Sequence, residues 1–123
     1  MSTILLVDAR ASRRKLAAMT LLQAGHRVVQ AGSLRDAPDL ALRHAPELVL
    51  LGVEHPLTES LRALRRIKAH PATFALRLHA LSARAGDVDE ASIRAAGFDG
   101  LLDRPLDYRA LHRYVDAALR GRS

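Results

Sequence analysis

Leu48-Val49-Leu50-Leu51 is an uninterrupted apolar run that leads directly into Gly52. A run of this kind is typical of a strand that is buried on both faces of a parallel sheet. Four further apolar segments predict the remaining strands, at residues 4–7, 28–29, 76–81 and 101–102. The sequence therefore predicts five short strands, of which the third is the clearest.

Stretches with helical periodicity separate these runs. Leu16, Met19 and Leu22 step by three and predict the apolar face of a first helix, which stops before Gly25. Two later stripes predict a third helix and a last helix, with apolar residues at Leu57, Leu61, Leu64 and Ile67, and at Leu111, Val115 and Leu119.

Capping residues indicate where other helices begin. Asp87 is a candidate cap for a fourth helix, and Asp107 for the last one. Ser33 and Asp36 are spaced as in a capping box, but Pro38 would then lie inside the helix. A start nearer Asp36 removes this conflict, so we expect the second helix to be short or displaced.

Strands that alternate with helices at this spacing indicate an α/β fold, in which helices cover both faces of a parallel sheet. The chain has 123 residues, which suits a single domain over residues 1–123, and its 49% hydrophobic content is ordinary for a globular protein. It has no cysteine, which excludes disulfides and thiolate metal sites. It also lacks the pattern of a membrane span or a signal peptide. We therefore expect a cytoplasmic protein that needs no membrane.

The formal net charge is +6, and the positive charge is almost entirely arginine, since lysine occurs only at Lys15 and Lys68. Such a charge suits an acidic partner, a nucleotide or a nucleic acid. Aromatic residues make up only 3% of the chain, so no stacking platform for bases accompanies the charge. A solvated, arginine-rich surface is the preferred interpretation, and nucleic acid is not an expected partner.

Polar residues follow the predicted strands at the point where each strand ends. Asp8 follows the first, Gly52 ends the third, Ser82 follows the fourth and Arg104 follows the fifth. The carboxyl ends of parallel strands meet at one edge of a sheet, where α/β proteins bind their ligands. These residues are therefore expected to converge on a small polar pocket.

Five motifs, in this order and at this spacing, resemble the receiver domains of response regulators. They are Ile4-Leu5-Leu6-Val7-Asp8, Pro46-Glu47-Leu48-Val49-Leu50-Leu51, His55-Pro56, Ala80-Leu81-Ser82-Ala83 and Gly97-Phe98-Asp99-Gly100 with Arg104-Pro105-Leu106. The likeness covers essentially the whole chain. It implies a CheY-like, doubly wound (βα)5 fold with strand order 2-1-3-4-5, and a place in two-component signalling.

Receivers of this family accept a phosphoryl group from a kinase histidine on an aspartate after the third strand, with the help of Mg²⁺. Asp8 matches the first acid of the metal-binding pair, but Ala9 replaces the second. Gly52 stands at the acceptor position and has no side chain that could act as a nucleophile. Ser82 matches the hydroxyl that contacts the phosphoryl group.

Two further positions depart from the family pattern. Arg104 replaces the usual lysine, although Pro105 after it matches, and Leu101 replaces the aromatic residue that usually switches. We therefore expect no cofactor, with Mg²⁺ binding lost or weak. We also expect an ion pair between Asp8 and Arg104, which would do internally what Mg²⁺ and lysine do around a phosphate.

The preferred hypothesis is a pseudo-receiver that works without phosphorylation and is not an enzyme. It would bind a histidine kinase, another regulator or a second copy of itself, and the resemblance favours Arg109, His112 and Arg113 on the last helix as the interface. Two alternatives stay open. Glu54 or His55 could serve as a surrogate phosphoryl acceptor, or the arginines could bind a nucleotide such as a cyclic dinucleotide.

Two remaining features invite an interpretation. A basic cluster begins the first helix, where cations oppose the helix dipole, which suggests either a binding role or a solvated turn. It consists of Arg10, Arg13, Arg14 and Lys15. His79 lies at a strand position that is normally apolar, and we expect it to be hydrogen-bonded in the core or at an edge rather than to bind a metal or act as a pH switch.

Overall fold

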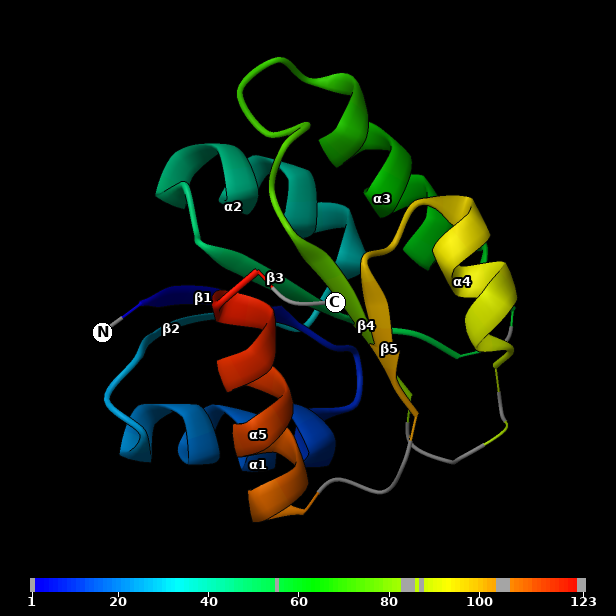
Figure 1. Cartoon of the computed structure of the whole chain (residues 1–123). Coiled ribbons are helices and arrows are strands. Elements are labelled where there is room, and N and C mark those ends of the chain that lie inside the picture. The colour runs from blue at the N-terminus through cyan, green and yellow to red at the C-terminus, as the bar shows by residue number, and fades with distance from the viewer. Residues whose placement is uncertain (1, 55, 83–85, 87, 104–106, 122–123) are drawn as a thin grey trace.

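The computed structural model describes residues 2–54, 56–82, 86, 88–103 and 107–121. Its sheet consists of five parallel strands in the order β2-β1-β3-β4-β5, as the resemblance implies (Figure 1). The strands are β1 (Thr3–Val7), β2 (Arg27–Ala31), β3 (Leu48–Gly52), β4 (Leu78–Leu81) and β5 (Gly100–Leu102). All five predicted strands are therefore confirmed, and β4 is shorter than expected at its start.

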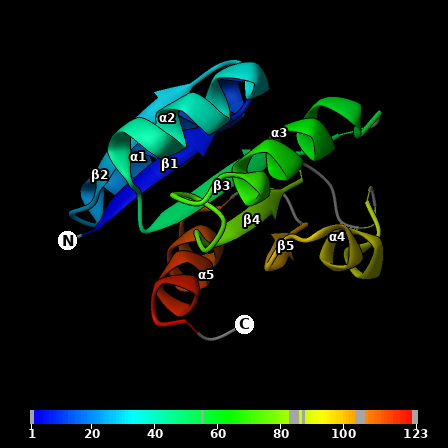
Figure 2. The same cartoon turned by 90° about the horizontal axis from the view of Figure 1, so that it is seen from above.

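Helices cover both faces of the sheet. They are α1 (Ala11–Gln23), α2 (Ala37–His44), α3 (Thr58–Ala69), α4 (Glu90–Ala96) and α5 (Tyr108–Leu119), with a short 3-10 turn, η1 (Leu34–Asp36), before α2. One apolar core joins the sheet to α2, α3 and α4, and a second joins the opposite face to α1 and α5. Figure 2 shows α2, α3 and α4 following one another across the sheet. None of the described helices is long and apolar enough to span a bilayer.

Local sequence explains where the helices begin. Pro38 lies in the first turn of α2, where its missing N–H is not needed. The helix therefore begins next to Asp36 and, as predicted, is short. Ser33 caps η1 instead, by accepting a hydrogen bond from the backbone N–H of Arg35. Asp107 caps α5 as predicted, through the N–H of Ala110 at 2.8 Å. For α4 the capping residue is Asp89, while Asp87 lies outside the described residues.

The predicted apolar face of α1 is wrong. The step of three residues drifts around the helix, so Leu16, Met19 and Leu22 are 42%, 54% and 53% exposed. The buried face instead carries Ala17 and Leu21, which are spaced by four and pack against the core. Small alanines on this face let α1 lie close to the sheet. The first turn of α1 also buries a charged residue, Arg13.

Candidate functional site

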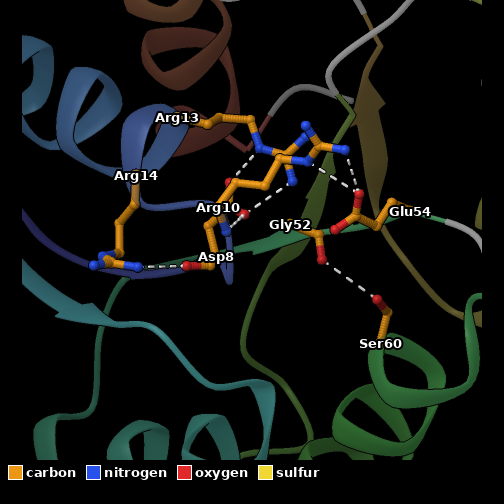
Figure 3. A network of polar contacts seen from close by, with 7 residues as sticks. All are labelled: Asp8, Arg10, Arg13, Arg14, Gly52, Glu54 and Ser60. Carbon is orange, nitrogen blue, oxygen red and sulfur yellow. Dashed lines mark hydrogen bonds and ion pairs between the residues drawn. The ribbon is translucent and has the colours of Figure 1, made fainter.

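Asp8 lies at the carboxyl end of β1 and is almost completely buried, with 1% of its surface exposed. Arg13, from the first turn of α1, forms a two-pronged ion pair with it (Figure 3). The Nε of Arg13 donates to Oδ2 of Asp8, and its Nη2 donates to Oδ1 at 2.9 Å. This geometry matches a guanidinium to a carboxylate at both oxygens, which is the strongest arrangement for such a pair.

Two neighbouring arginines hold the same loop. The backbone N–H of Arg10 donates to Oδ1 of Asp8 at 3.0 Å, and Nη1 of Arg14 donates to the carbonyl oxygen of Asp8 at 2.7 Å. The Arg10 guanidinium donates from Nε and Nη2 to one oxygen of Glu54, at 3.0 and 2.8 Å. This hydrogen bond from Arg10 lowers the pKa of Glu54 below its ordinary value. Three of the four cations that begin α1 thus hold the ends of β1 and β3.

Gly52, the last residue of β3, faces the ion pair. A Cβ atom at this position would stand 2.6 Å from both Cγ and Oδ1 of Asp8 and 2.9 Å from Nη2 of Arg13. A Cβ atom essentially never comes this close to a non-bonded atom, so any side chain at position 52 would have to displace the pair. The carbonyl oxygen of Gly52 accepts a hydrogen bond from the hydroxyl of Ser60 on α3, at 3.3 Å.

The residues predicted to converge do so in part. Asp8, Ala9 and Gly52 line one pocket of about 280 Å³, together with Arg13 and Glu54. Ser82 is buried at the end of β4, where its N–H donates to the carbonyl of Leu102, and Leu101 is buried in β5. Arg104 and Pro105 lie outside the described residues, and so does the predicted contact between Asp8 and Arg104.

Arg13 is the residue of this site that sequence reasoning missed. The sequence places the basic start of α1 in solvent or against a partner, whereas only 8% of the surface of Arg13 is exposed. A usable signal was present, because Asp8 ends a strand and Arg13 lies five residues later in the first turn of a helix. At that separation a long side chain on the helix can reach back over the loop to the carboxylate.

A second buried polar contact lies between the sheet and α5. Nδ1 of His79 and the hydroxyl of Tyr114 are 2.6 Å apart, and the two rings meet edge to face. Burial lowers the pKa of His79 and raises the pKa of Tyr114, so burial favours the uncharged form of both groups. The expectation that His79 is hydrogen-bonded in the core is confirmed. Gly100 leaves the space for this contact, since a Cβ there would lie 2.8 Å from Nδ1 of His79.

The candidate interface on α5 is exposed. Arg109, His112 and Arg113 are spaced by three and four residues, so they share one face of the helix, and each is open to solvent. The opposite face packs Leu111 and Val115 into the core, as predicted.

Several known proteins are similar to this chain over almost its whole length. The chain is 28% identical over 122 residues to Protein PilH of Pseudomonas aeruginosa, and the match covers 98% of this chain and 100% of PilH. It is 30% identical over 120 residues to the Streptomyces coelicolor transcriptional regulatory protein AfsQ1, covering 98% of this chain. The chain has the CheY-like fold of response-regulator receivers. It spans about half the length of AfsQ1, 52%, and no family model matches it.

The receiver fold is equally clear from solved structures. The receiver domain of sensor histidine kinase PA1611 from Pseudomonas aeruginosa superposes with a TM-score of 0.84 and 24% identity, over 97% of this chain and 98% of that domain. That structure has a magnesium ion coordinated in its active-site cleft. The likeness to that domain extends over nearly the whole chain and shows the same fold.

Proposed function

We propose that this receiver works without phosphorylation and acts by binding another signalling protein. The observation that carries the proposal is the relationship between Gly52 and the Asp8–Arg13 pair. The position of the acceptor carboxylate has no side chain, and the space that such a side chain would enter is filled. A phosphoryl group has no nucleophile to join there.

The donor atoms around Asp8 also support weak or lost Mg²⁺ binding. Mg²⁺ requires several oxygen ligands in near-octahedral geometry. Here both oxygens of Asp8 already accept hydrogen bonds from Arg13, and Ala9 and Gly52 supply no side-chain oxygen. Over the described part of the chain, no three acidic or histidine side chains gather as a metal site would need. The residues present therefore do not suit the ion.

A surrogate acceptor is less favoured by the same geometry. Glu54 follows β3, but the guanidinium of Arg10 holds one of its oxygens with two hydrogen bonds. A carboxylate that is paired in this way is a weaker nucleophile, and it is not placed at the acceptor position. His55, the other candidate, lies outside the described residues.

Binding would be the output of such a receiver. The exposed face of α5 that carries Arg109, His112 and Arg113 is the surface we assign to it, with an acidic surface on the partner. The partner class is a histidine kinase, another regulator or a second copy of this chain.

Intact-mass spectrometry tests the proposal directly. The protein is incubated with acetyl phosphate and Mg²⁺ beside a receiver that carries the acceptor aspartate. We expect no phosphoryl adduct on this chain while the control is labelled. A stoichiometric, Mg²⁺-dependent adduct would overturn the proposal, and peptide mapping would then begin with Glu54 and His55.

A further inference from the structure

A groove follows the seam between α2 and α3, and its narrow end reaches Leu34 and Glu59, which also line the pocket at Asp8. Its largest hollow, of about 380 Å³, is lined by Pro38 and Leu42 from α2, Arg66 from α3, and His70 after α3. Arg66 and Pro38 also line a small adjoining hollow of about 20 Å³, together with Arg35 of η1. The two hollows therefore meet at Arg66, with a roomy end and a narrow end.

The charges along this groove are not balanced. Two carboxylates line it, and each is paired with an arginine on its own helix: Asp39 with Arg43 at 3.0 Å, and Glu59 with Arg62 at 3.2 Å. The guanidinium groups of Arg35 and Arg66 form no ion pair or hydrogen bond with any residue that the structure describes. Two uncompensated cations therefore flank the narrow end, and a chain of net charge +6 draws anions toward them.

The roomy end offers different chemistry. Leu42 is 45% exposed there, next to the ring of Pro38 and the imidazole of His70. Apolar surface beside a planar ring suits a flat heterocycle, and the volume lies within the usual range for small-molecule sites, about 300–1,000 Å³. The groove thus places an apolar, partly flat surface next to a pair of free guanidinium groups.

We propose that this groove binds a nucleotide with at least two phosphates. The narrow hollow, of about 20 Å³, has room for little more than a water, so the phosphates lie on the surface over it, against Arg35 and Arg66. The nucleoside lies in the roomy end against Leu42 and His70. Guanidinium groups bind phosphate oxygens with paired hydrogen bonds, which gives the contact direction as well as charge. This site goes beyond the partner-binding function proposed above and does not depend on it.

Fluorescence titration of the whole chain with a fluorescent ADP derivative tests the site. Unlabelled ADP should displace the probe, while pyrophosphate and adenosine, which each carry half of the ligand, should compete about tenfold less well. Arg66→Glu should weaken ADP binding by about tenfold or more, since it replaces a phosphate contact with a like charge.

Matched variants separate this site from general charge. Arg65→Glu makes the same charge change one residue away, where the side chain lines none of these hollows, so binding should stay within about threefold of the wild type. Leu42→Ala should weaken binding. Leu22→Ala should not, because this leucine on α1 is exposed to a similar degree, 53% against 45%, but lines neither hollow. Circular dichroism and the melting temperature confirm that each variant is folded.

Three outcomes would overturn the proposal. Absence of ADP binding at millimolar concentration refutes the site itself. Equal losses in the Arg65 and Arg66 variants would show attraction to net charge alone. Competition by pyrophosphate that equals competition by ADP would show that no nucleoside is recognised.

Discussion

The Cγ of Asp8 lies 2.6 Å from the point that a Cβ on Gly52 would occupy. The glycine and the carboxylate are therefore interdependent: the buried Asp8–Arg13 pair requires a residue without a side chain at position 52. A substitution at position 52 should therefore disturb the ion pair, and a substitution in the pair should change the packing at position 52.

Gly52→Ala should destabilise the domain by about 1–3 kcal/mol, the usual cost of forcing one extra carbon into a packed site. The clash must move a carboxylate that Arg13 holds in place. Urea denaturation measures the effect. Gly52→Asp should be at least as destabilised, and it should not regain phosphorylation while Arg13 remains.

Gly32→Ala is the matched control for the alanine change. A Cβ at Gly32 would approach the guanidinium of Arg14, with Nη1 nearest at 3.0 Å. This group bonds the carbonyl oxygen of Asp8, but it is the end of a flexible side chain and can shift by a few tenths of an ångström without moving the buried ion pair. Its free energy of unfolding should stay within about 0.5 kcal/mol of the wild type. Equal losses in the two variants would contradict the special role of the contact at Gly52.

Arg13→Met should cost about 3–5 kcal/mol, because it leaves the Asp8 carboxylate buried without its cation. Asp8→Asn combined with Arg13→Met should lose less than the sum of the single changes, since neither charge is then left alone. A double-mutant cycle in urea measures this coupling. Additive losses would mean that the two side chains do not depend on each other.

His79 should make the stability of the domain depend on pH. Burial lowers its pKa, so between the lowered value and the ordinary one, about 6.5, the unfolded chain binds a proton that the native state does not. Stability is then fully present above about pH 6.5 and falls as the pH drops below that value. Asp99 opposes the shift, whereas Arg94 and Arg77 add to it.

His79→Gln tests this dependence, because an amide can still bond the Tyr114 hydroxyl but does not titrate. Urea denaturation at about pH 7.5 and pH 5.5 should show a smaller loss on acidification in this variant than in the wild type. His112→Gln, at an exposed position on α5, is the control and should keep the wild-type slope. An unchanged slope in His79→Gln would rule out His79 as the cause.

Arg77 should stabilise the end of α5. Its Nη1 donates to the carbonyl oxygens of Ala118 and Leu119, at 3.0 and 2.9 Å, where a helix C-terminus favours a cation. Arg77→Met should therefore lower the free energy of unfolding by about 1–2 kcal/mol. Arg109→Met removes an exposed cation from the first turn of the same helix, where it opposes the dipole, and should be neutral or slightly stabilising.

Sequence patterns predicted the elements whose signals are local. The run from Leu48 to Leu51 is buried on both faces of the sheet. Pro38 lies in the first turn of α2, as expected for a residue without an N–H, so the helix begins next to Asp36. Asp107 was found as a cap because capping involves residues only three apart. In each case, the residues that determine the feature lie within a few positions of one another in the sequence.

The predictions were wrong where the outcome depends on tertiary packing. Leu16, Met19 and Leu22 have the hydrophobicity of a core face, but Ala17 and Leu21 on α1 lie toward the sheet. Which of two apolar stripes is buried depends on how the helix packs, and periodicity alone does not show it. Arg13 was assigned to the surface for a related reason: a charged residue is buried only when its partner is, and burial of Asp8 follows from the sheet.

The Asp8–Arg13 pair has a consequence for how this pocket responds to its surroundings. A counter-ion that is part of the chain has a fixed local concentration, whereas a dissolved ion leaves its site when it is diluted or chelated. Chelating agents or a shortage of divalent ions cannot remove Arg13 from Asp8. The charge of Asp8 is thus balanced from within the chain, and this balance does not depend on the supply of divalent ions.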